Sequence, residues 1–345
     1  MGVRRSGWTR LVSAVILTTS MASGCARSPV EMTAGTSSLH AHLDRSSRSE
    51  ESELRFLHRP LDLVARGDST FVVDSGNDRI VVFDHSLRPV STFGQTGGGP
   101  GEFEMPTAVH LWRDTLIIAD VNNRRFDFFT IDGRYVRSLR TAFVSSAFSV
   151  LGGGQIVVAV RDRGYFAGHI AVDGSINRTA PAPAHPRMPF RRRYARARPL
   201  LAVTPGDTLH VFDQETGVLR KFSPQGEEVL ARSLPDALLE RIVANRSRLI
   251  RGLAKQGIRT RSVPLLKSLH ATAEGDLLLL LPDVRSAVIL VDARTYTYSE
   301  IAAPSPAEAT PLRSAVAATA RNGVLTIINQ DGLFTYRIQE DRGAD

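Results

Sequence analysis

Short apolar runs alternate with turns rich in glycine and aspartate along most of the chain. Residues 67–74 (GDSTFVVD) align with residues 113–120 (RDTLIIAD) and residues 206–213 (GDTLHVFD). Each copy is a turn followed by β-branched or aliphatic residues, a pattern that predicts a buried β-strand. Weaker copies begin near Gly154, Gly275 and Gly323. The sequence therefore repeats one strand unit six times.

The spacing of these copies predicts a propeller. Their anchors are separated by 46, 41, 52, 69 and 48 residues, close to the length of a four-stranded blade; the anchors are Gly67, Arg113, Gly154, Gly206, Gly275 and Gly323. The long interval contains a helical pattern that Ser233 can cap, with Asp236 three residues later. Its apolar residues follow an i, i+3, i+4 spacing: Leu238, Leu239, Ile242, Val243, Leu249, Ile250 and Leu253. We predict an all-β, six-bladed propeller over residues 52–340, with one helical insert at residues 233–257.

A closed ring needs its first and last blades to share strands, because an open ring leaves unpaired edges. The segment before the first blade, residues 54–57, is apolar at three of its four positions. We predict that it forms the outermost strand of the last blade, beside residues 334–338.

The second blade carries a more specific motif. Phe93-Gly94 and a glycine-rich stretch over residues 97–101 lead to Phe103 and Pro106; Asp120 and an Asn-Arg turn at residues 122–124 follow. These residues resemble the NHL repeat, a resemblance that is specific over about residues 60–140 and that implies a six-bladed propeller. The glycine-rich stretch is interpreted as a blade connection, since it lacks the Lys and Ser/Thr of a P-loop. The recurrent Asp74, Asp120 and Asp213 stand where strands meet turns, and we expect them to accept hydrogen bonds from nearby backbone amides.

The N-terminus has the layout of a secretory signal. Arg4, Arg5 and Arg10 precede an apolar run at residues 11–22, and Ser23-Gly24-Cys25 follows it. The apolar run is too short to span a bilayer. This end resembles the bacterial lipobox, which implies that residues 1–24 are a signal peptide and that Cys25 is acylated. Cys25 is the only cysteine, so no intramolecular disulfide can form. We expect an exported protein anchored in the cell envelope by lipid, with the outer membrane favoured because Ala26 is not aspartate. Residues 25–51, rich in Ser, Thr and charge, are expected to be a flexible, disordered tether.

Composition adds one feature. The chain is 42% hydrophobic and 23% charged, which is enough for a sizeable core. Its net charge of +8 includes Arg4, Arg5 and Arg10 of the N-terminal segment, and basic residues are otherwise dense in one place. That place is a predicted insert loop at residues 179–199, where the arginines are Arg187, Arg191, Arg192, Arg193, Arg196 and Arg198. The cluster is either a solvated loop or a contact for anionic lipid headgroups or acidic surface polymer. A nucleic-acid partner is not expected for an exported protein.

The strands that open each blade line the channel of a propeller, and three of them carry ionisable residues: Asp62, His110 and His270. Six-bladed lactonases and amidating lyases that resemble NHL proteins hold metal in this channel, but no local spacing here specifies a metal site. No nucleophile elbow, catalytic cysteine or zinc pattern occurs in the chain. The first hypothesis is therefore a monomeric module that binds a protein or glycan, without catalysis or cofactor. The alternative is a metal-dependent hydrolase or lyase that uses calcium or zinc in the channel.

Overall fold

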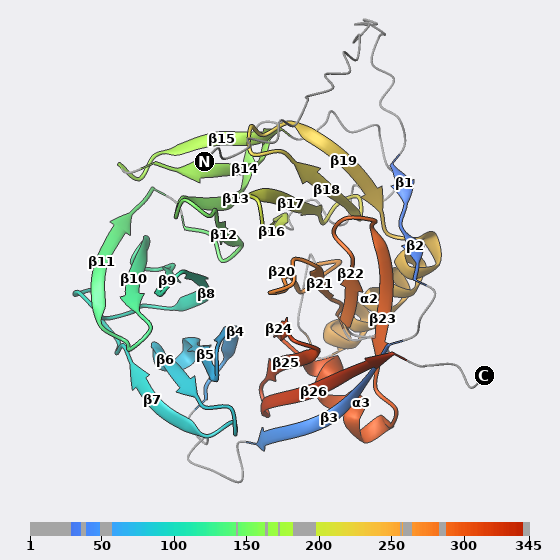
Figure 1. The fold of residues 1–345 in the computed structure, drawn as a ribbon, viewed down its shortest axis with the longest axis horizontal. Coiled ribbons are helices and arrows are strands. Elements are labelled where there is room, and N and C mark those ends of the chain that lie inside the picture. Colours follow the sequence, from blue (N-terminus) through green and yellow to red (C-terminus); the bar gives the residue numbers. More distant parts are fainter. Residues whose placement is uncertain are drawn as a thin grey trace, which may run out of the picture.

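The structure is a computed structural model that describes residues 29–35, 39–48, 57–142, 144–162, 165–171, 173–181, 198–255, 257, 264–282 and 288–340. Six antiparallel blades surround a central axis, as predicted (Figure 1). In the first three blades the strands are β4 (Pro60–Arg66), β5 (Ser69–Asp74), β6 (Arg79–Phe83) and β7 (Pro89–Phe93); β8 (Pro106–Trp112), β9 (Thr115–Asp120), β10 (Arg125–Thr130) and β11 (Tyr135–Arg140); and β12 (Phe148–Val150), β13 (Ile156–Asp162), β14 (Tyr165–Ile170) and β15 (Ile176–Pro181). In the other three they are β16 (Leu200–Thr204), β17 (Thr208–Asp213), β18 (Val218–Phe222) and β19 (Glu228–Ser233); β20 (Ser268–Ala271), β21 (Leu277–Leu280), β22 (Val288–Val291) and β23 (Thr297–Ala302); and β24 (Ala317–Arg321), β25 (Val324–Asn329), β26 (Gly332–Glu340) and β3 (Leu39–Arg48).

The core lies between neighbouring blades. Phe71 and Val73 of the first blade pack with Val109 and Ile118 of the second in one buried cluster. Because both faces of a middle strand are covered by adjacent blades, β5, β9 and β17 are buried from their second residue to their last. This explains why the repeated sequence is continuously apolar there and does not alternate.

The six anchors of the sequence repeat occupy the turns between the first and second strands of the blades. All six have positive φ: Gly67, Arg113, Gly154, Gly206, Gly275 and Gly323, with values between 54° and 94°. Glycine adopts this left-handed conformation without steric cost, which explains why five of the six anchors are glycine. Arg113 shows that the positive φ recurs in every copy even where the residue type changes.

Ring closure uses a different segment from the one predicted. β3 pairs antiparallel with β26 from Gly332↔Arg48 to Glu340↔Leu39, and its first residues pair in parallel with β23. Since β25 and β3 occupy both edges of β26, the prediction that residues 54–57 fill this place was wrong; residues 54–56 lie outside the described residues. β3 alternates apolar and polar residues only from Leu39 to Asp44, where Leu39 and Ala41 are buried. Its second half is polar, so the short alternation was overlooked in a segment rich in Ser, Thr and charge.

The expected tether is also corrected. β1 (Val30–Glu31) pairs with β19, and β2 (Thr33–Ala34) pairs with β23. Between them Met32 is only 3% exposed and belongs to the core of the fourth and fifth blades. The propeller thus begins near residue 29. Backbone pairing of β1 and β2 and the buried side chain of Met32 fix this segment, although its sequence has no apolar periodicity.

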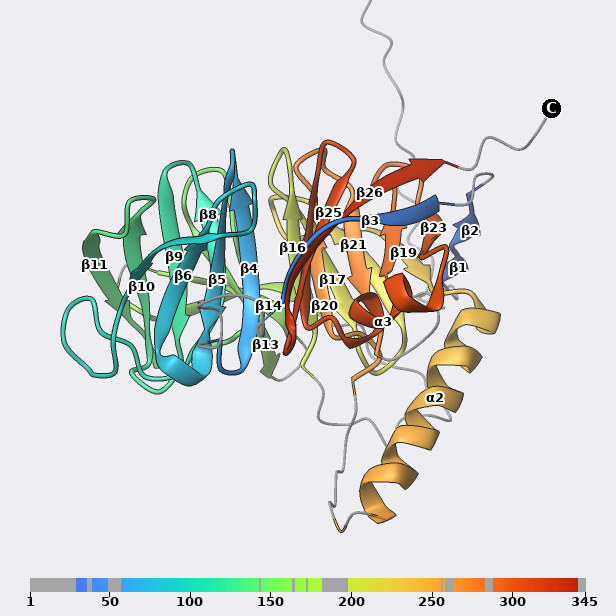
Figure 2. The ribbon, with the colours of Figure 1, turned by 90° about the horizontal axis from the view of Figure 1, so that it is seen from below.

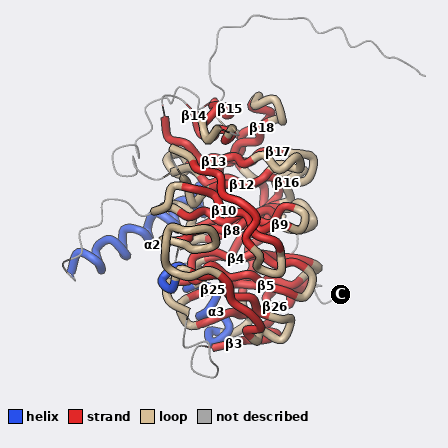
Figure 3. The backbone as a smooth tube through the Cα atoms, turned by 90° about the vertical axis from the view of Figure 1, so that its left-hand side faces the viewer, coloured by secondary structure: helices blue, strands red, loops and turns tan. Residues whose placement is uncertain are grey.

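Two helices are present among the described residues. α2 (Asp236–Lys255) is the predicted insert and extends away from the disc (Figures 2 and 3), but Ser233 ends strand β19 and does not cap the helix. α3 (Pro306–Ser314) was not predicted, although Ser305 and Glu308 have the Ser-x-x-Glu spacing of a capping box. The Ser305 hydroxyl accepts from the Glu308 amide and donates to the Glu308 carboxylate. Among the described residues, no helix is long and apolar enough to cross a membrane. The signal segment with Cys25, and residues 182–197 of the predicted insert loop, lie outside the described residues.

Candidate functional site

The two faces of the disc differ in their connections. At one face, which we call the turn face, the first strand of each blade ends and a short turn leads to the second strand. At the other, which we call the insert face, the chain passes from one blade to the next. The described connections at the insert face include the glycine-rich loop, α2 and α3. Among the described residues, the insert face therefore carries the long additions to the repeat.

A pocket opens at each end of the axis. The pocket at the turn face has a volume of about 860 Å³ and is lined by turn residues such as Gly67, Asp207 and Arg321. The pocket at the insert face has a volume of about 450 Å³ and is lined by blade entries such as Leu61, Ser146 and Leu200. His110 and His270 line both pockets, so they lie at the constriction between them.

The three channel residues chosen from the sequence come together at this constriction. Asp62 Oδ1 lies 4.0 Å from His270 Nε2, and Asp62, His110 and His270 all line the insert-face pocket. The inner strands β4, β8 and β20 thus bring these three side chains to one pocket. A role of these side chains in the channel stays a prediction.

Asp62 is held by two backbone amides. Its Oδ1 accepts from Leu63 N at 2.9 Å, and its Oδ2 accepts from Val109 N at 3.0 Å. Burial raises the pKa of this carboxyl, whereas the nearby His270 and the two amides lower it. Because the second amide belongs to the next blade, Asp62 joins the inner strands of the first two blades.

The two histidines differ in environment. Burial, with a smaller contribution from the charge of His270, lowers the pKa of His110 to about 4, so His110 is neutral near pH 7. His110 also packs against the ring of Phe148, with centroids 5.3 Å apart. His270 Nε2 is buried and has no hydrogen-bond partner among the described residues. A buried, unpartnered ring nitrogen is costly unless a ligand or water satisfies it.

A metal does not fit these residues as they stand. Within the described part of the chain, no group of three or more His, Cys, Asp or Glu side chains could hold a metal ion. The one carboxylate in the channel constriction already accepts two amide hydrogen bonds.

Lysine and serine side chains around the insert-face pocket were not singled out from the sequence. Lys267 Nζ donates to the carbonyls of Arg313 and Ala315, at the end of α3, and so ties the wall of the pocket to that helix. Ser268 Oγ is buried without a partner among the described residues, and Ser146 is exposed at the pocket. No sequence motif marks these residues, because only the ring brings them together.

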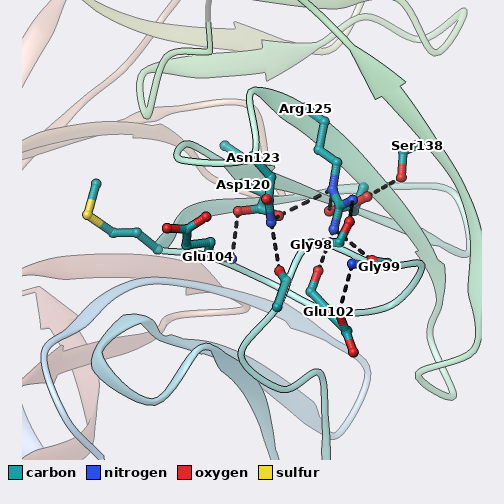
Figure 4. Close-up of polar contacts among 12 residues, drawn as sticks. Gly98, Gly99, Glu102, Glu104, Asp120, Asn123, Arg125 and Ser138 are labelled. Carbon is teal, nitrogen blue, oxygen red and sulfur yellow. Dashed lines mark hydrogen bonds and ion pairs between the residues drawn. The ribbon is translucent and has the colours of Figure 1, made fainter.

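The glycine-rich loop on the insert face is organised by one arginine (Figure 4). Arg125 is 3% exposed and its guanidinium donates to the carbonyls of Gly98, Gly99 and Glu102 at 2.6–3.0 Å. Its Nε lies 2.9 Å from Asp127 and 3.3 Å from Asp120. The loop is thus a blade connection with internal partners, as predicted.

The same arrangement recurs one blade earlier. Asp120 accepts from Asn123 and the Glu104 amide, and Asp74 accepts from Asn77, Arg79 and the His58 amide. The predicted role of these aspartates at strand-to-turn junctions is confirmed, as it is for Asp213, which accepts from the Glu215 amide. From the sequence, the arginine of this turn was assigned to Arg124, and Arg125 was not singled out. The 46-residue spacing between Arg79 and Arg125, equal to one blade, indicates that these two arginines are equivalent.

A second buried histidine is structural. His210 is fully buried on β17 and its two ring nitrogens contact Thr204 Oγ1 at 3.1 Å and Tyr296 OH at 3.0 Å. Burial, with a smaller effect from Lys221, lowers its pKa to about 4. Of the six clustered arginines, only Arg198 lies within the described residues, where it is exposed.

Comparison with solved structures supports the fold. A Bacteroides fragilis protein described provisionally as exported is 11% identical, with a TM-score of 0.55 over 91% of this chain and 99% of the other. A Bacteroides thetaiotaomicron protein of unknown function is 8% identical, with a TM-score of 0.54 over 88% and 76%. A protein assigned provisionally as a gluconolactonase is 10% identical, with a TM-score of 0.50 over 90% and 95%.

No family model matches the chain, and no curated protein matches it. At these identities the likeness shows the fold alone. The chain is a β-propeller that resembles six-bladed structures, among them proteins of unknown function and a presumed lactonase.

Proposed function

We propose that this protein is an exported, lipid-anchored module that binds a protein or glycan partner on its insert face. One observation carries the proposal: the long connections that the structure describes, with the glycine-rich loop, α2 and α3, gather at the face where the 450 Å³ pocket opens. Loops on a rigid scaffold are where binding residues concentrate. The turn face, by contrast, consists of short turns between paired strands.

The chemistry of the pocket suits a small, partly apolar group of a larger partner. Leu61, Leu200 and Phe148 supply apolar walls, while Ser268 and His270 present buried polar atoms without partners among the described residues. Apolar pockets with a few convergent polar groups are typical of binding sites. A donor or acceptor of the ligand would remove the cost of these unsatisfied atoms.

The pocket at the turn face fits this role less well, although it is larger. Two of its charged side chains already have partners: Asp207 accepts from the Gly152 amide, and Arg66 pairs with Asp114 and the Arg113 carbonyl. These contacts connect one turn to the next and stabilise the ring.

Export and lipidation rest on the signal-like N-terminus and on Cys25. The proposed anchor is tested by mass spectrometry of the mature N-terminus, which should begin at an acylated Cys25. An intact N-terminus, or an unmodified Cys25, would refute the anchor without touching the binding site. The cluster of arginines in the sequence between β15 and β16, of which only Arg198 is described, would favour an anionic partner.

A second candidate is the metal-dependent hydrolase or lyase. Asp62, His110 and His270 line the same pocket of the channel, but as they stand these three side chains do not form a group that could hold a metal ion, so this candidate ranks below the binding module. Metal analysis of the purified protein tests it, since stoichiometric calcium or zinc that is lost in a His110→Ala, His270→Ala variant would establish this alternative.

Photocrosslinking in intact cells tests the binding proposal. A photoreactive residue at Ser146 probes the insert face, and one at the exposed Ala273 probes the turn face. We expect one defined protein or glycan adduct at Ser146 and none at Ala273. Adducts that form equally at both positions would reject the insert face as the binding surface.

A further inference from the structure

Helix α2 carries a row of exposed cations. Arg241, Arg248 and Lys255 are spaced by seven residues, and Arg251 lies between them; all four are exposed. Seven residues are nearly two helical turns, so these side chains follow one stripe at intervals of roughly 10 Å. From residue 241 to residue 255 the helix contains no aspartate or glutamate. Arg241 pairs with Glu300, which leaves the last two turns as the strongest positive region of the helix.

The opposite side of α2 packs on the propeller. Leu238 and Ile242 are buried in the same cluster as Met32 and Leu266. Asn245 is buried too, and its Nδ2 donates to the carbonyl of Pro282 at 3.0 Å. These contacts fix the rotation of the helix about its axis, so the cationic stripe faces away from the ring while the helix extends from the disc (Figure 2).

The chain enters the described structure beside the base of this helix. Val30 pairs with Arg232, and Met32 N donates to Ser233 O, three residues before α2 begins at Asp236. Only five residue steps separate Cys25 from Val30, and an extended chain of that length reaches at most about 17 Å. An acyl group on Cys25 would therefore hold this edge of the fourth blade close to the bilayer.

We propose that α2 lies against the membrane and binds anionic lipid headgroups through Arg248, Arg251 and Lys255. This inference rests on the proposed lipid anchor, which would place α2 near the bilayer. The positive charge of the helix is the reason for choosing anionic lipid as its partner. Cations near an anionic bilayer surface each strengthen binding several-fold, and a lipid chain combined with a basic patch gives stable attachment. With the fourth blade held at the bilayer, the ring has one fixed orientation.

Vesicle binding by the chain from residue 25 onward, carrying Cys25→Ser, isolates the contribution of the helix. The probe is vesicles of equal parts phosphatidylglycerol and phosphatidylcholine, compared with pure phosphatidylcholine. We expect binding to the anionic vesicles only, and a loss of roughly 100-fold in the Arg248→Glu, Arg251→Glu, Lys255→Glu variant. The matched control, Arg124→Glu, Arg134→Glu, Arg140→Glu, reverses three exposed cations of the second blade across the ring (Figure 1) and should bind like the parent chain.

The outcomes separate this inference from the proposed function. Equal loss in both triple variants would show that net charge alone drives binding, and no loss in the α2 variant would show that the helix does not touch the bilayer; either result overturns the inference. Both leave the crosslinks at Ser146 and the mass of the N-terminus unaffected. An α2 variant that binds vesicles normally but loses a crosslinked protein would assign the stripe to that protein and equally reject the lipid contact. Circular dichroism and the melting temperature check that all variants keep the fold.

Discussion

Asp62 Oδ1 and His270 Nε2 lie 4.0 Å apart at the constriction of the channel, yet of these two atoms only the carboxylate oxygen takes part in a hydrogen bond among the described residues. Asp62 accepts hydrogen bonds from two inner strands, whereas His270 Nε2 has no partner among the described residues. The carboxylate therefore stabilises the ring, and the imidazole is available to a ligand. This division separates structural from functional residues in the channel.

Asp62→Asn tests the structural half of that statement. An amide can accept through one oxygen only, so either Leu63 N or Val109 N loses its partner. We expect the free energy of unfolding to fall by about 1–3 kcal/mol, measured by urea denaturation. The exposed Asp68 provides the matched control, and Asp68→Asn should change stability by less than about 0.5 kcal/mol. Equal stability of Asp62→Asn and the parent protein would contradict the proposed role.

Replacement of Arg125 should also destabilise the protein strongly. Arg125→Met leaves Asp120 and Asp127 buried without their cation, and we expect a loss of about 3–5 kcal/mol near neutral pH. Burial raises the pKa of Asp120 to about 6 even with Arg125 beside it, and removal of the cation raises it further. The loss should therefore shrink as the pH falls toward 6, because the carboxylate of the variant takes up its proton first. The exposed neighbour Arg124 is the control, and thermal melts of both Met variants provide the comparison. Similar melting temperatures would show that Arg125 does not organise the loop.

The stability of the ring should decline in weak acid through His210. Its pKa is near 6.5 when unfolded and about 4 when folded, so the unfolded chain binds the extra proton between these values. The contribution of His210 to the free energy of unfolding is therefore fully present above pH 6.5. The free energy of unfolding falls by about 3 kcal/mol as the pH falls to 4. His210→Gln should flatten the pH profile of the unfolding free energy, and His85→Gln, at an exposed position, should not. A His210→Gln profile as steep as that of the parent would reject this explanation.

Closure by β3 can be tested at two adjacent residues. Ala41 is fully buried, while His42 is exposed on the other side of the strand. Ala41→Asp should destabilise the protein by about 3–5 kcal/mol because it buries an unpaired charge. His42→Asp should stay within about 0.5 kcal/mol. Equal effects on the denaturation midpoint would mean that β3 is not packed into the ring in solution.

The sequence was sufficient for the blades because their turns and middle strands are local features. A positive φ after each inner strand selects glycine, and burial on two faces selects an unbroken apolar run, so both repeat at blade intervals. The closing strand has no such signal, since β3 is defined by its pairing with β26 at the far end of the chain. Similarly, α3 is short and contains Pro311, and only its capping box marked it.

The site was predictable in part. Asp62, His110 and His270 follow from the rule that inner strands line the channel, so their meeting was predictable once the blades were placed. Ser268 opens the inner strand β20 two residues before His270, so the same rule places it in the channel although it was not singled out. Ser146 and Lys267 lie in connections before inner strands, and no spacing in the chain indicates that these two residues share a pocket.

The insert face as the binding surface is tested most directly by the affinity of the crosslinked partner for two tryptophan variants. Ser146→Trp fills the pocket at the insert face, and Ala273→Trp places the same side chain at the opposite end of the axis. Titration calorimetry should show that Ser146→Trp loses at least about 100-fold in affinity, equivalent to about 3 kcal/mol, while Ala273→Trp binds like the parent protein. Normal binding by Ser146→Trp together with a loss in Ala273→Trp would contradict the account and move the site to the turn face.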